Sequence, residues 1–160
     1  MVAMLGQDFE RAKSEADLAL VFNPNSAEAY ACLASICTFS GRPLEAIPLI
    51  ERAIVLDPIY DQQYLHMLGV ANLLAGKYET AAAVLRQRIL QVPGTDFSRA
   101  VLASALGHLG DLDEARRIWG ELERINPGYS FDGHFGRLPF TNREDVRRIA
   151  DGLAKAGLPH

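Results

Sequence analysis

Apolar residues recur at helical spacing along most of the chain, most clearly within residues 62–94. One apolar stripe there contains Leu65 and Leu68, and a second stripe follows Gly76 and ends before Pro93. Residues three and four apart share one face of an α-helix, while glycine and proline mark helix ends. The pattern therefore predicts two amphipathic helices joined by a tight turn. Neither helix could bury its stripe alone, so the two are predicted to pack together.

The glycines and prolines that separate these elements recur at a nearly constant interval. Successive members of each set are 34 or 35 residues apart, and the sets are Pro24, Pro58, Pro93 and Pro127, and Gly41, Gly76 and Gly110. A period of about 34 residues with two helices in each unit resembles the tetratricopeptide repeat. We count three full repeats, with positions numbered from residues 27, 62 and 96.

Residue types at fixed positions of the repeats carry this resemblance. In the family, small residues at the eighth and twentieth positions let two antiparallel helices approach closely. A large apolar residue at the twenty-fourth position fills the space between them. In this sequence the three sets are Ala34, Gly69 and Ala103; Ala46, Ala81 and Ala115; and Ile50, Leu85 and Trp119. Three matches in register make the resemblance specific.

The resemblance implies both a fold and a division of the chain. The fold is an all-α, right-handed tetratricopeptide-repeat superhelix with about nine helical elements, no sheet and a C-terminal capping helix. We expect a single domain over residues 1–160, divided into a half repeat at 1–26, repeats at 27–60, 61–95 and 96–128, and a C-terminal cap at 129–160. Within this cap, at most one short helix is predicted before Phe140. A final helix is predicted to start within Thr141–Glu144 and to stop at Gly157.

Two arginines depart from the repeat pattern at the junction between the second and third repeats. Arg88 stands at a twenty-seventh position, where alanine is usual, and Arg99 at a fourth position, where the earlier repeats have Tyr30 and Leu65. Long basic side chains can lay their stems along apolar surface and keep their charged ends in water. We interpret both arginines in this way, in preference to a dedicated ion pair.

Composition and charge limit the classes of partner. The chain is 49% hydrophobic and 22% charged with a net charge of -4, which is ordinary for a soluble domain. A nucleic-acid surface needs a basic excess, and the sequence has neither a basic cluster for a membrane surface nor a spanning apolar run. We therefore expect no nucleic acid, no membrane and, without a signal peptide, a cytoplasmic location. Cys32 and Cys37 lie too far around one predicted helix to pair with each other, which agrees with a reducing compartment.

The first helix of each repeat presents the residues that face a ligand groove in this family. At the family's groove positions this chain has Glu28, Ala31, Ser35, Thr38, Phe39, Gln63, His66, Val70, Leu73, Leu74, Phe97, Ala100, Ser104, Gly107 and His108. The set is neutral and largely apolar, which favours a strip of a partner protein or peptide. One family variant clamps the carboxylates of chaperone tails, but Ala31, Ser35, Phe97 and Val101 occupy the places of its clamp. A carboxylate ligand is therefore predicted to find no cation there.

Candidate chemistry in the groove is limited to His66 and His108. They alone among the groove residues titrate near neutrality or bind metals, but a transition-metal site needs three or four ligands and no third ligand accompanies them. We interpret both as solvated or hydrogen-bonded, and the same applies to His134 and His160. No phosphate-binding loop, hydrolase serine turn or metal motif is present. The sequence thus predicts a non-catalytic chain with no cofactor and no metal.

Two segments resemble a narrower group of proteins. Residues 64–110, which begin YLHMLGVANLLAGKYETAAAVL, and the tail GLAKAGLP at 152–159 resemble the repeat region that follows the catalytic domain in many bacterial class III adenylate cyclases. The resemblance implies a regulatory or scaffolding tail of a signalling protein, with a cyclase domain before residue 1. None of the cyclase family's metal-binding aspartates or base-reading residues can be placed in this chain, so no catalytic role carries over.

Self-association is the alternative to partner binding. A natural array rarely opens on half a repeat, so we expect the chain to be cut from a longer one. The missing helix leaves an apolar edge formed by Leu5, Phe9, Ala12 and Ala16. A homodimer through this edge is one expectation. A groove filled by the chain's own C-terminal segment, or by a second copy, is another.

Overall fold

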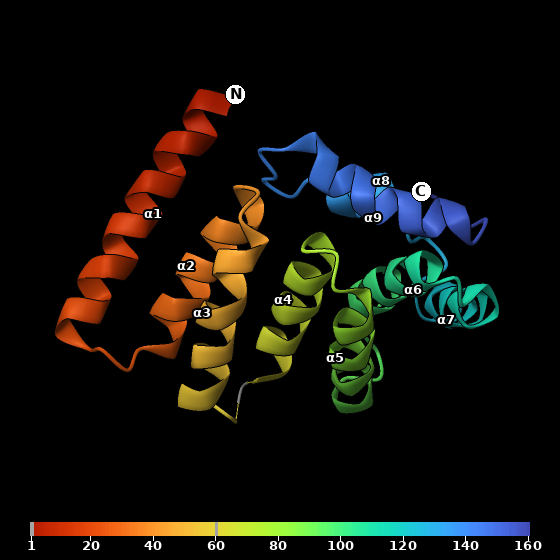
Figure 1. The fold of residues 1–160 in the computed structure, drawn as a ribbon, viewed down its shortest axis with the longest axis horizontal. Coiled ribbons are helices and arrows are strands. Elements are labelled where there is room, and N and C mark those ends of the chain that lie inside the picture. Colours follow the sequence, from red (N-terminus) through yellow and green to blue (C-terminus); the bar gives the residue numbers. More distant parts are fainter. Residues whose placement is uncertain (1, 60) are drawn as a thin grey trace.

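The chain forms nine α-helices and no β-strand in the computed structural model, which describes residues 2–59 and 61–160, with side chains for 8–59 and 62–160 (Figure 1). The helices are α1 (Val2–Phe22), α2 (Ala27–Phe39), α3 (Pro43–Leu56), α4 (Asp61–Leu74), α5 (Tyr78–Gln91), α6 (Phe97–Leu109), α7 (Leu112–Ile125), α8 (Phe131–Phe135) and α9 (Arg143–Lys155). Within the described ranges, none of the helices combines the length and apolar character needed to cross a membrane.

Helices α2 to α7 form three pairs that stack on one another. The pairs are α2 with α3, α4 with α5, and α6 with α7, and α3 packs on α4 as α5 packs on α6. Figure 1 shows the pairs side by side, with each pair turned relative to the one before. The all-α superhelix predicted from the 34-residue period is confirmed. The array leaves the first helix of each pair, α2, α4 and α6, to form its inner face.

The small positions of the repeat lie where the helices of a pair come closest. Ala46, Ala81 and Ala115 are fully buried, and a side chain at Gly69 would meet Leu85 Cδ2 at 2.5 Å. Each pair turns on a glycine with positive φ, at Gly41, Gly76 and Gly110. A residue with a side chain is strained in that conformation. The glycine spacing of the sequence is therefore set by the tight turns.

The C-terminal segment 129–160 folds back over the array. It contains the single short helix α8 and the final helix α9, as predicted, and α9 packs on α6 and α4 (Figure 1). The α9 N-cap is Asn142, which accepts a hydrogen bond from Glu144 N. Thr141 instead donates its backbone N–H and its hydroxyl to Phe39 O, at 2.9 and 3.1 Å. The segment therefore reaches from the end of α7 to the end of α2.

The interpretation of Arg99 as a side chain whose charged end lies in water is wrong. The Arg99 side chain is 7% exposed, pairs with Glu121 through Nε at 3.2 Å and donates to Thr95 O at 2.6 Å. Burial of α6 under its neighbours leaves this guanidinium no path to water, so it is paired internally. Arg88 is half-buried, and its Nε is buried without a hydrogen-bond partner among the described atoms.

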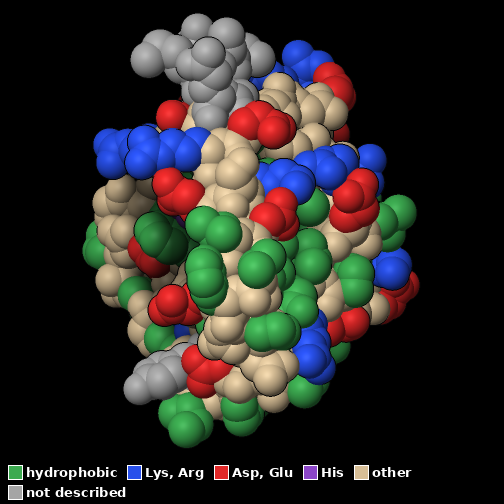
Figure 2. All heavy atoms as spheres, turned by 90° about the vertical axis from the view of Figure 1, so that its left-hand side faces the viewer, with side chains coloured by type: hydrophobic (Ala, Val, Ile, Leu, Met, Phe, Trp, Pro, Cys, Tyr) green, Lys and Arg blue, Asp and Glu red, His purple; other side chains and the backbone are tan. Residues whose placement is uncertain are grey.

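Helix α1 packs on α2 and presents its other side to solvent. Of the predicted apolar edge, Phe9 and Ala12 are half-buried and Ala16 is only 5% exposed, whereas the Leu5 side chain lies outside the described residues. Figure 2 faces this side of the molecule and shows hydrophobic side chains among charged ones. The large exposed apolar residues of α1 are Leu18, Val21 and Phe22, which are 56%, 75% and 82% exposed.

Candidate functional site

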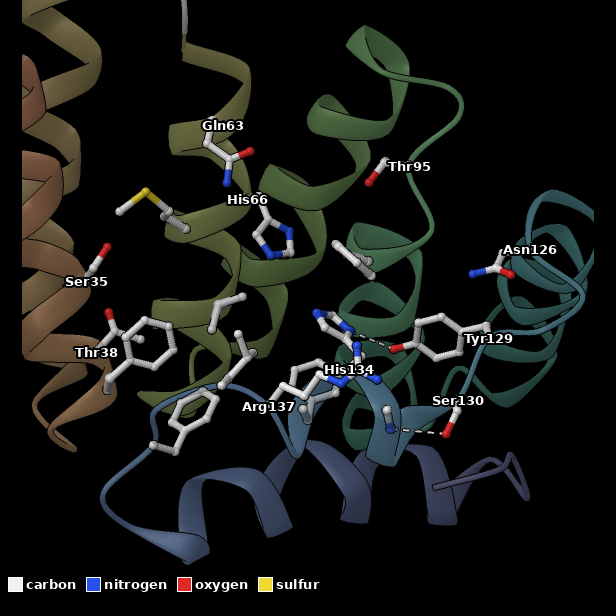
Figure 3. Close-up of a pocket in the computed structure, with 18 of the residues that line it drawn as sticks. Ser35, Thr38, Gln63, His66, Thr95, Asn126, Tyr129, Ser130, His134 and Arg137 are labelled. Atoms are coloured by element: carbon white, nitrogen blue, oxygen red, sulfur yellow. Dashed lines mark hydrogen bonds between the residues drawn. The ribbon is translucent and has the colours of Figure 1, made fainter. Parts of the chain in front are cut away.

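A cavity of about 740 Å³ lies on the inner face of the array (Figure 3). One wall comes from α2 and α4, and another from the loop before α6 and from Phe97 at its start. The segment 128–140, which includes α8, closes the cavity from the opposite side. We call this segment the roof of the cavity. Figure 3 shows Ser35, Gln63 and His66 facing Tyr129 and His134 across the space.

The cavity brings together one part of the predicted groove. These residues come from all three inner helices and are Ser35, Thr38, Phe39, Gln63, His66, Val70 and Phe97. They occupy corresponding faces of successive inner helices because the repeats stack in register. Glu28 and Ala31, nearer the start of α2, do not line the cavity. Glu28 is exposed and Ala31 is half-buried.

The rest of the predicted groove is covered by the chain itself. Leu73, Ala100 and Ser104 have no exposed surface, and Leu74 is 3% exposed. Here α9 lies directly on α6: a side chain at Gly107 would collide with the backbone oxygen of Gly152. This half of the inner face is therefore closed to a partner as long as α9 stays in place.

Polar contacts fix α9 on this sealed half. Ser104 donates its hydroxyl to Ile149 O at 2.7 Å. His108 Nε2 lies 2.7 Å from Arg148 O, and because a carbonyl only accepts, Nε2 carries the proton. His108 Nδ1 is then the acceptor for Lys155 Nζ at 3.2 Å. Burial lowers the pKa of His108, in agreement with this neutral imidazole.

The roof of the cavity is held at both ends by aromatic contacts. At one end, His134 Nδ1 lies 2.9 Å from the Tyr129 hydroxyl, and its ring stacks on Phe97 with centroids 3.9 Å apart. At the other end, Phe140 packs edge-on against Phe39 with centroids 5.0 Å apart. The roof thus spans the inner face from the third helix pair to the first and leaves a hollow beneath it.

Both histidines of the cavity are hydrogen-bonded, as the sequence predicted. His66 Nδ1 lies 2.9 Å from Ser98 Oγ. Its pKa is lowered to about 4, first by burial and then by the positive charge of Arg88, and burial lowers the pKa of His134 to about 4. Ser98 has no exposed surface, so this serine–histidine pair is out of reach of a substrate. In the described ranges, no three His, Cys, Asp or Glu side chains lie together as metal ligands would.

Comparison with known protein families identifies the repeats. A sequence model of the tetratricopeptide repeat matches residues 62–87 and 97–121, which correspond to the second and third helix pairs. The second and third helix pairs thus match the tetratricopeptide repeat. A comparison with curated protein sequences finds no significant match.

Three solved structures share the fold of this chain. A crystal structure of MamA is 22% identical with a TM-score of 0.71, covering 95% of this chain and 91% of that one. A second MamA structure is 22% identical with a TM-score of 0.70, covering 95% and 85%. YrrB, described as a TPR protein with an unusual peptide-binding site, is 21% identical with a TM-score of 0.67, covering 97% and 80%. At these identities the likeness establishes the fold.

Sequence reasoning missed the residues that the tetratricopeptide-repeat pattern does not place on the inner face. Arg88 comes from the outer helix α5 and Arg137 from the roof, and both line the cavity. The clamp positions Ala31, Ser35, Phe97 and Val101 carry no cation, as the sequence shows, but these two arginines bring cations to the cavity from other positions. Arg88 did carry a signal, because it replaces an expected alanine. The roof carried only its aromatic content, with Tyr129, Phe135 and Phe140 all lining the cavity.

Proposed function

We propose that this chain is a non-catalytic protein-interaction module that binds a short segment of a partner protein in the cavity. The observation that carries the proposal is the cavity itself, an apolar hollow on the inner helices of a tetratricopeptide-repeat array. Its volume of about 740 Å³ lies within the range of about 300–1,000 Å³ that is typical of ligand pockets. YrrB, with the same fold, is described as having a peptide-binding site.

Site-specific cross-linking tests this proposal in the native cytoplasm. A photo-reactive residue placed at Gln63, which is exposed and lines the cavity, is expected to capture a partner. The same residue at Glu79, which is exposed on the outer helix α5, is the matched control and is expected to capture nothing above background. Equal capture at the two positions would place the binding surface elsewhere. Loss of the Gln63 product on Phe97→Glu, at the 48% exposed rim residue, would locate the ligand in the cavity.

The cavity variant must avoid the sealed half of the inner face. Leu74 is a predicted groove residue, but it is 3% exposed and its carbonyl accepts a hydrogen bond from Arg148 at 3.0 Å. A charged residue at position 74 would therefore disrupt the packing of α9 on the inner face, and a loss of binding could not be assigned to the cavity. Phe97 stacks on His134 of the roof, but nearly half of its surface is open to solvent, so Phe97→Glu is used only after circular dichroism shows that the variant keeps its fold.

We further propose that the module is the regulatory C-terminal part of a larger bacterial signalling protein in the cytoplasm, such as a class III adenylate cyclase. The similarity of residues 64–110 and 152–159 to such tails supports this context, and both cysteines are free. An antibody against this chain is expected to precipitate a polypeptide larger than 17.6 kDa together with cyclase activity. A native product of 17.6 kDa without that activity would contradict the context.

Self-association through α1 is the second candidate, and a specific patch favours it. Leu18, Val21 and Phe22 lie at i, i+3 and i+4 on one side of α1 and are all more than half exposed. If a second copy covers this patch, Phe22→Glu should lower the mass measured by light scattering, and Phe9→Glu should do the same if the predicted edge takes part. A dimer that both variants leave intact would exclude this face.

A further inference from the structure

The cavity carries a positive charge that nothing in its wall balances. Arg88 and Arg137 line it, and among the residues that the structure describes no Asp or Glu does. His66 and His134 are neutral at pH 7, because their pKa values lie at about 4. The charge of the cavity therefore comes from its two guanidinium groups.

One carboxylate lies near the cavity, but its oxygens are already engaged. Burial raises the pKa of Tyr129 and Asp96 adds to that rise, while at His134 the charge of Asp96 opposes the lowering of the pKa by burial. Its two oxygens accept hydrogen bonds from Phe97 N at 2.8 Å and from Asn126 Nδ2 at 2.9 Å. Asp96 thus serves as the N-cap of α6 and forms no ion pair with either arginine.

Arg88 occupies a position that belongs to the core in the other repeats. The equivalent twenty-seventh residues are Ala53 and Leu122, and both have no exposed surface. A charged residue at a core position costs stability unless it is paired. Residues that break the pattern of the fold without a compensating contact are expected at functional sites.

The guanidinium of Arg88 lacks such a partner. Its Nε is buried and makes no hydrogen bond within the described part of the molecule. Burial lowers its pKa, and its charge in turn lowers the pKa of His66, which shows that its field reaches the cavity wall. An anion in the cavity would supply the missing acceptor for this N–H.

Arg137 provides the second cation from the opposite side. It is an exposed residue of the roof and has no salt bridge among the described residues. Arg88 belongs to the array and Arg137 to the roof, so the two cations enter the cavity from different elements. The remaining wall is apolar and aromatic, with Phe39, Val70 and Phe140.

We infer that the cavity selects partner segments in which a carboxylate lies beside a large apolar side chain, with Arg88 and Arg137 as the residues that recognise the charge. Bidentate hydrogen bonds from guanidinium to carboxylate give both affinity and geometric selectivity. The inference rests on the proposed function and adds the chemistry of the ligand. The net charge of the chain, -4, is opposite in sign to the cavity, so recognition would be local to this site.

A displayed library of random heptapeptides, selected on the immobilised full chain, tests the inference. Peptides that bind should be enriched in Asp or Glu at least fivefold over the unselected library, next to Leu, Ile or Phe. The enrichment should disappear on Arg137→Gln and on Arg88→Gln. It should persist on Arg52→Gln, because Arg52 is exposed on α3 outside the cavity. A selected peptide should bind at least tenfold more weakly when its acid is replaced by the amide.

Two features of the design keep the result interpretable. Arg88 is half-buried, so Arg88→Gln is checked for folding by its dichroism, while Arg137→Gln alters an exposed roof residue and is expected to leave the fold intact. Display with free and with blocked C-termini separates a side-chain carboxylate from a terminal one. Enrichment in either format supports the inference.

Failure of the inference can be told apart from failure of the proposed function. Selected peptides without an excess of acids, or an acid preference that survives Arg137→Gln, would overturn the inference. If those peptides still compete with cross-linking at Gln63, the cavity remains the binding site. A library that yields no binder overturns the inference as well, and the proposed function then depends on the cross-linking result alone.

Discussion

The two halves of the inner face show how one repeated surface can either hold a ligand or hold the chain itself. Ser35 and Ser104 occupy the ninth position of the first and third repeats. Ser35 is half-buried in the wall of the cavity, whereas Ser104 is completely buried and donates a hydrogen bond to Ile149 O of α9. The same residue type at the same repeat position therefore contributes to a hollow in one half and to a helix interface in the other.

The twelfth position explains the difference. It is Thr38 in the first repeat and Gly107 in the third. At Gly107 the absence of a side chain lets α9 approach until its own Gly152 backbone touches α6. Thr38 is 6% exposed and lines the cavity beneath the roof. The missing side chain at Gly107 thus permits the close approach that fills this stretch of the groove from within.

The largest expected effect follows from removing this close contact. Gly107→Ala places a methyl group against the backbone oxygen of Gly152, which cannot move without shifting α9. Overpacking of this kind costs about 3 kcal/mol, which outweighs the helix propensity gained by alanine. Urea denaturation is expected to show the loss of stability. Relative to the unsubstituted chain, hydrogen exchange should become faster in α9 by a larger factor than in α2 and α3.

Gly120→Ala is the matched control for this prediction. Gly120 also lies in the middle of a helix, α7, but a side chain there would meet nothing within 4 Å. We expect it to stabilise the chain by about 0.5–1 kcal/mol through helix propensity alone. If Gly107→Ala behaves like Gly120→Ala, the close approach of α9 to α6 does not define the sealed half.

The sequence predicts the helix pairs of the array better than it predicts how the C-terminal segment covers them. Small residues such as Ala46 and Ala81 recur with the 34-residue period, because each repeat buries the same contact, and this regularity fixes the helix pairs. The contact between Gly107 and Gly152 occurs once and joins residues 45 positions apart, so no periodic signal reports it. Glycines at both sites look like ordinary helix-weakening residues until the two helices are seen together.

The same reasoning applies to the arginines. A long basic side chain such as that of Arg99 keeps its charged end in water only if its surroundings leave a route to solvent. Neighbouring helices close that route in the structure, and Glu121 lies within reach to pair with it. Arg88 enters the cavity because the roof encloses the space beside it. Both outcomes depend on tertiary packing, which the local pattern of α5 and α6 does not encode.

Acid should destabilise the two halves of the inner face to different extents, because each half contains a different histidine. The pKa of His66 is about 4 in the folded chain against an ordinary value of 6.5, so the unfolded chain binds protons more tightly between these values. Stability is therefore fully present above pH 6.5 and is lost as the pH falls toward 4. His66 alone should lower the free energy of unfolding by about 2 kcal/mol between pH 7 and pH 5, and His134 should add a further loss in the same direction.

Two amide substitutions locate this pH dependence. His66→Asn keeps a nitrogen near the Nδ1 that meets Ser98, and His108→Gln keeps one near the Nε2 that meets Arg148 O. His66 faces Arg88 and His134, whereas His108 faces Lys155, Arg148 and Asp151. The half that contains the cavity should contribute most of the pH dependence, so His66→Asn should reduce the change of stability with pH more than His108→Gln. The opposite order would show that the sealed half responds to acid first.

The smallest expected effect compares the two serines directly. Ser104→Ala removes a hydrogen bond of 2.7 Å between fully buried partners and should lower the free energy of unfolding by about 1 kcal/mol. Ser35→Ala removes a half-buried hydroxyl that faces the cavity, where water can replace its contacts, and should change stability by less than about 0.5 kcal/mol. Chemical denaturation of both variants under one set of conditions gives the comparison. Equal costs would mean that the ninth position of the repeat is structural in both halves.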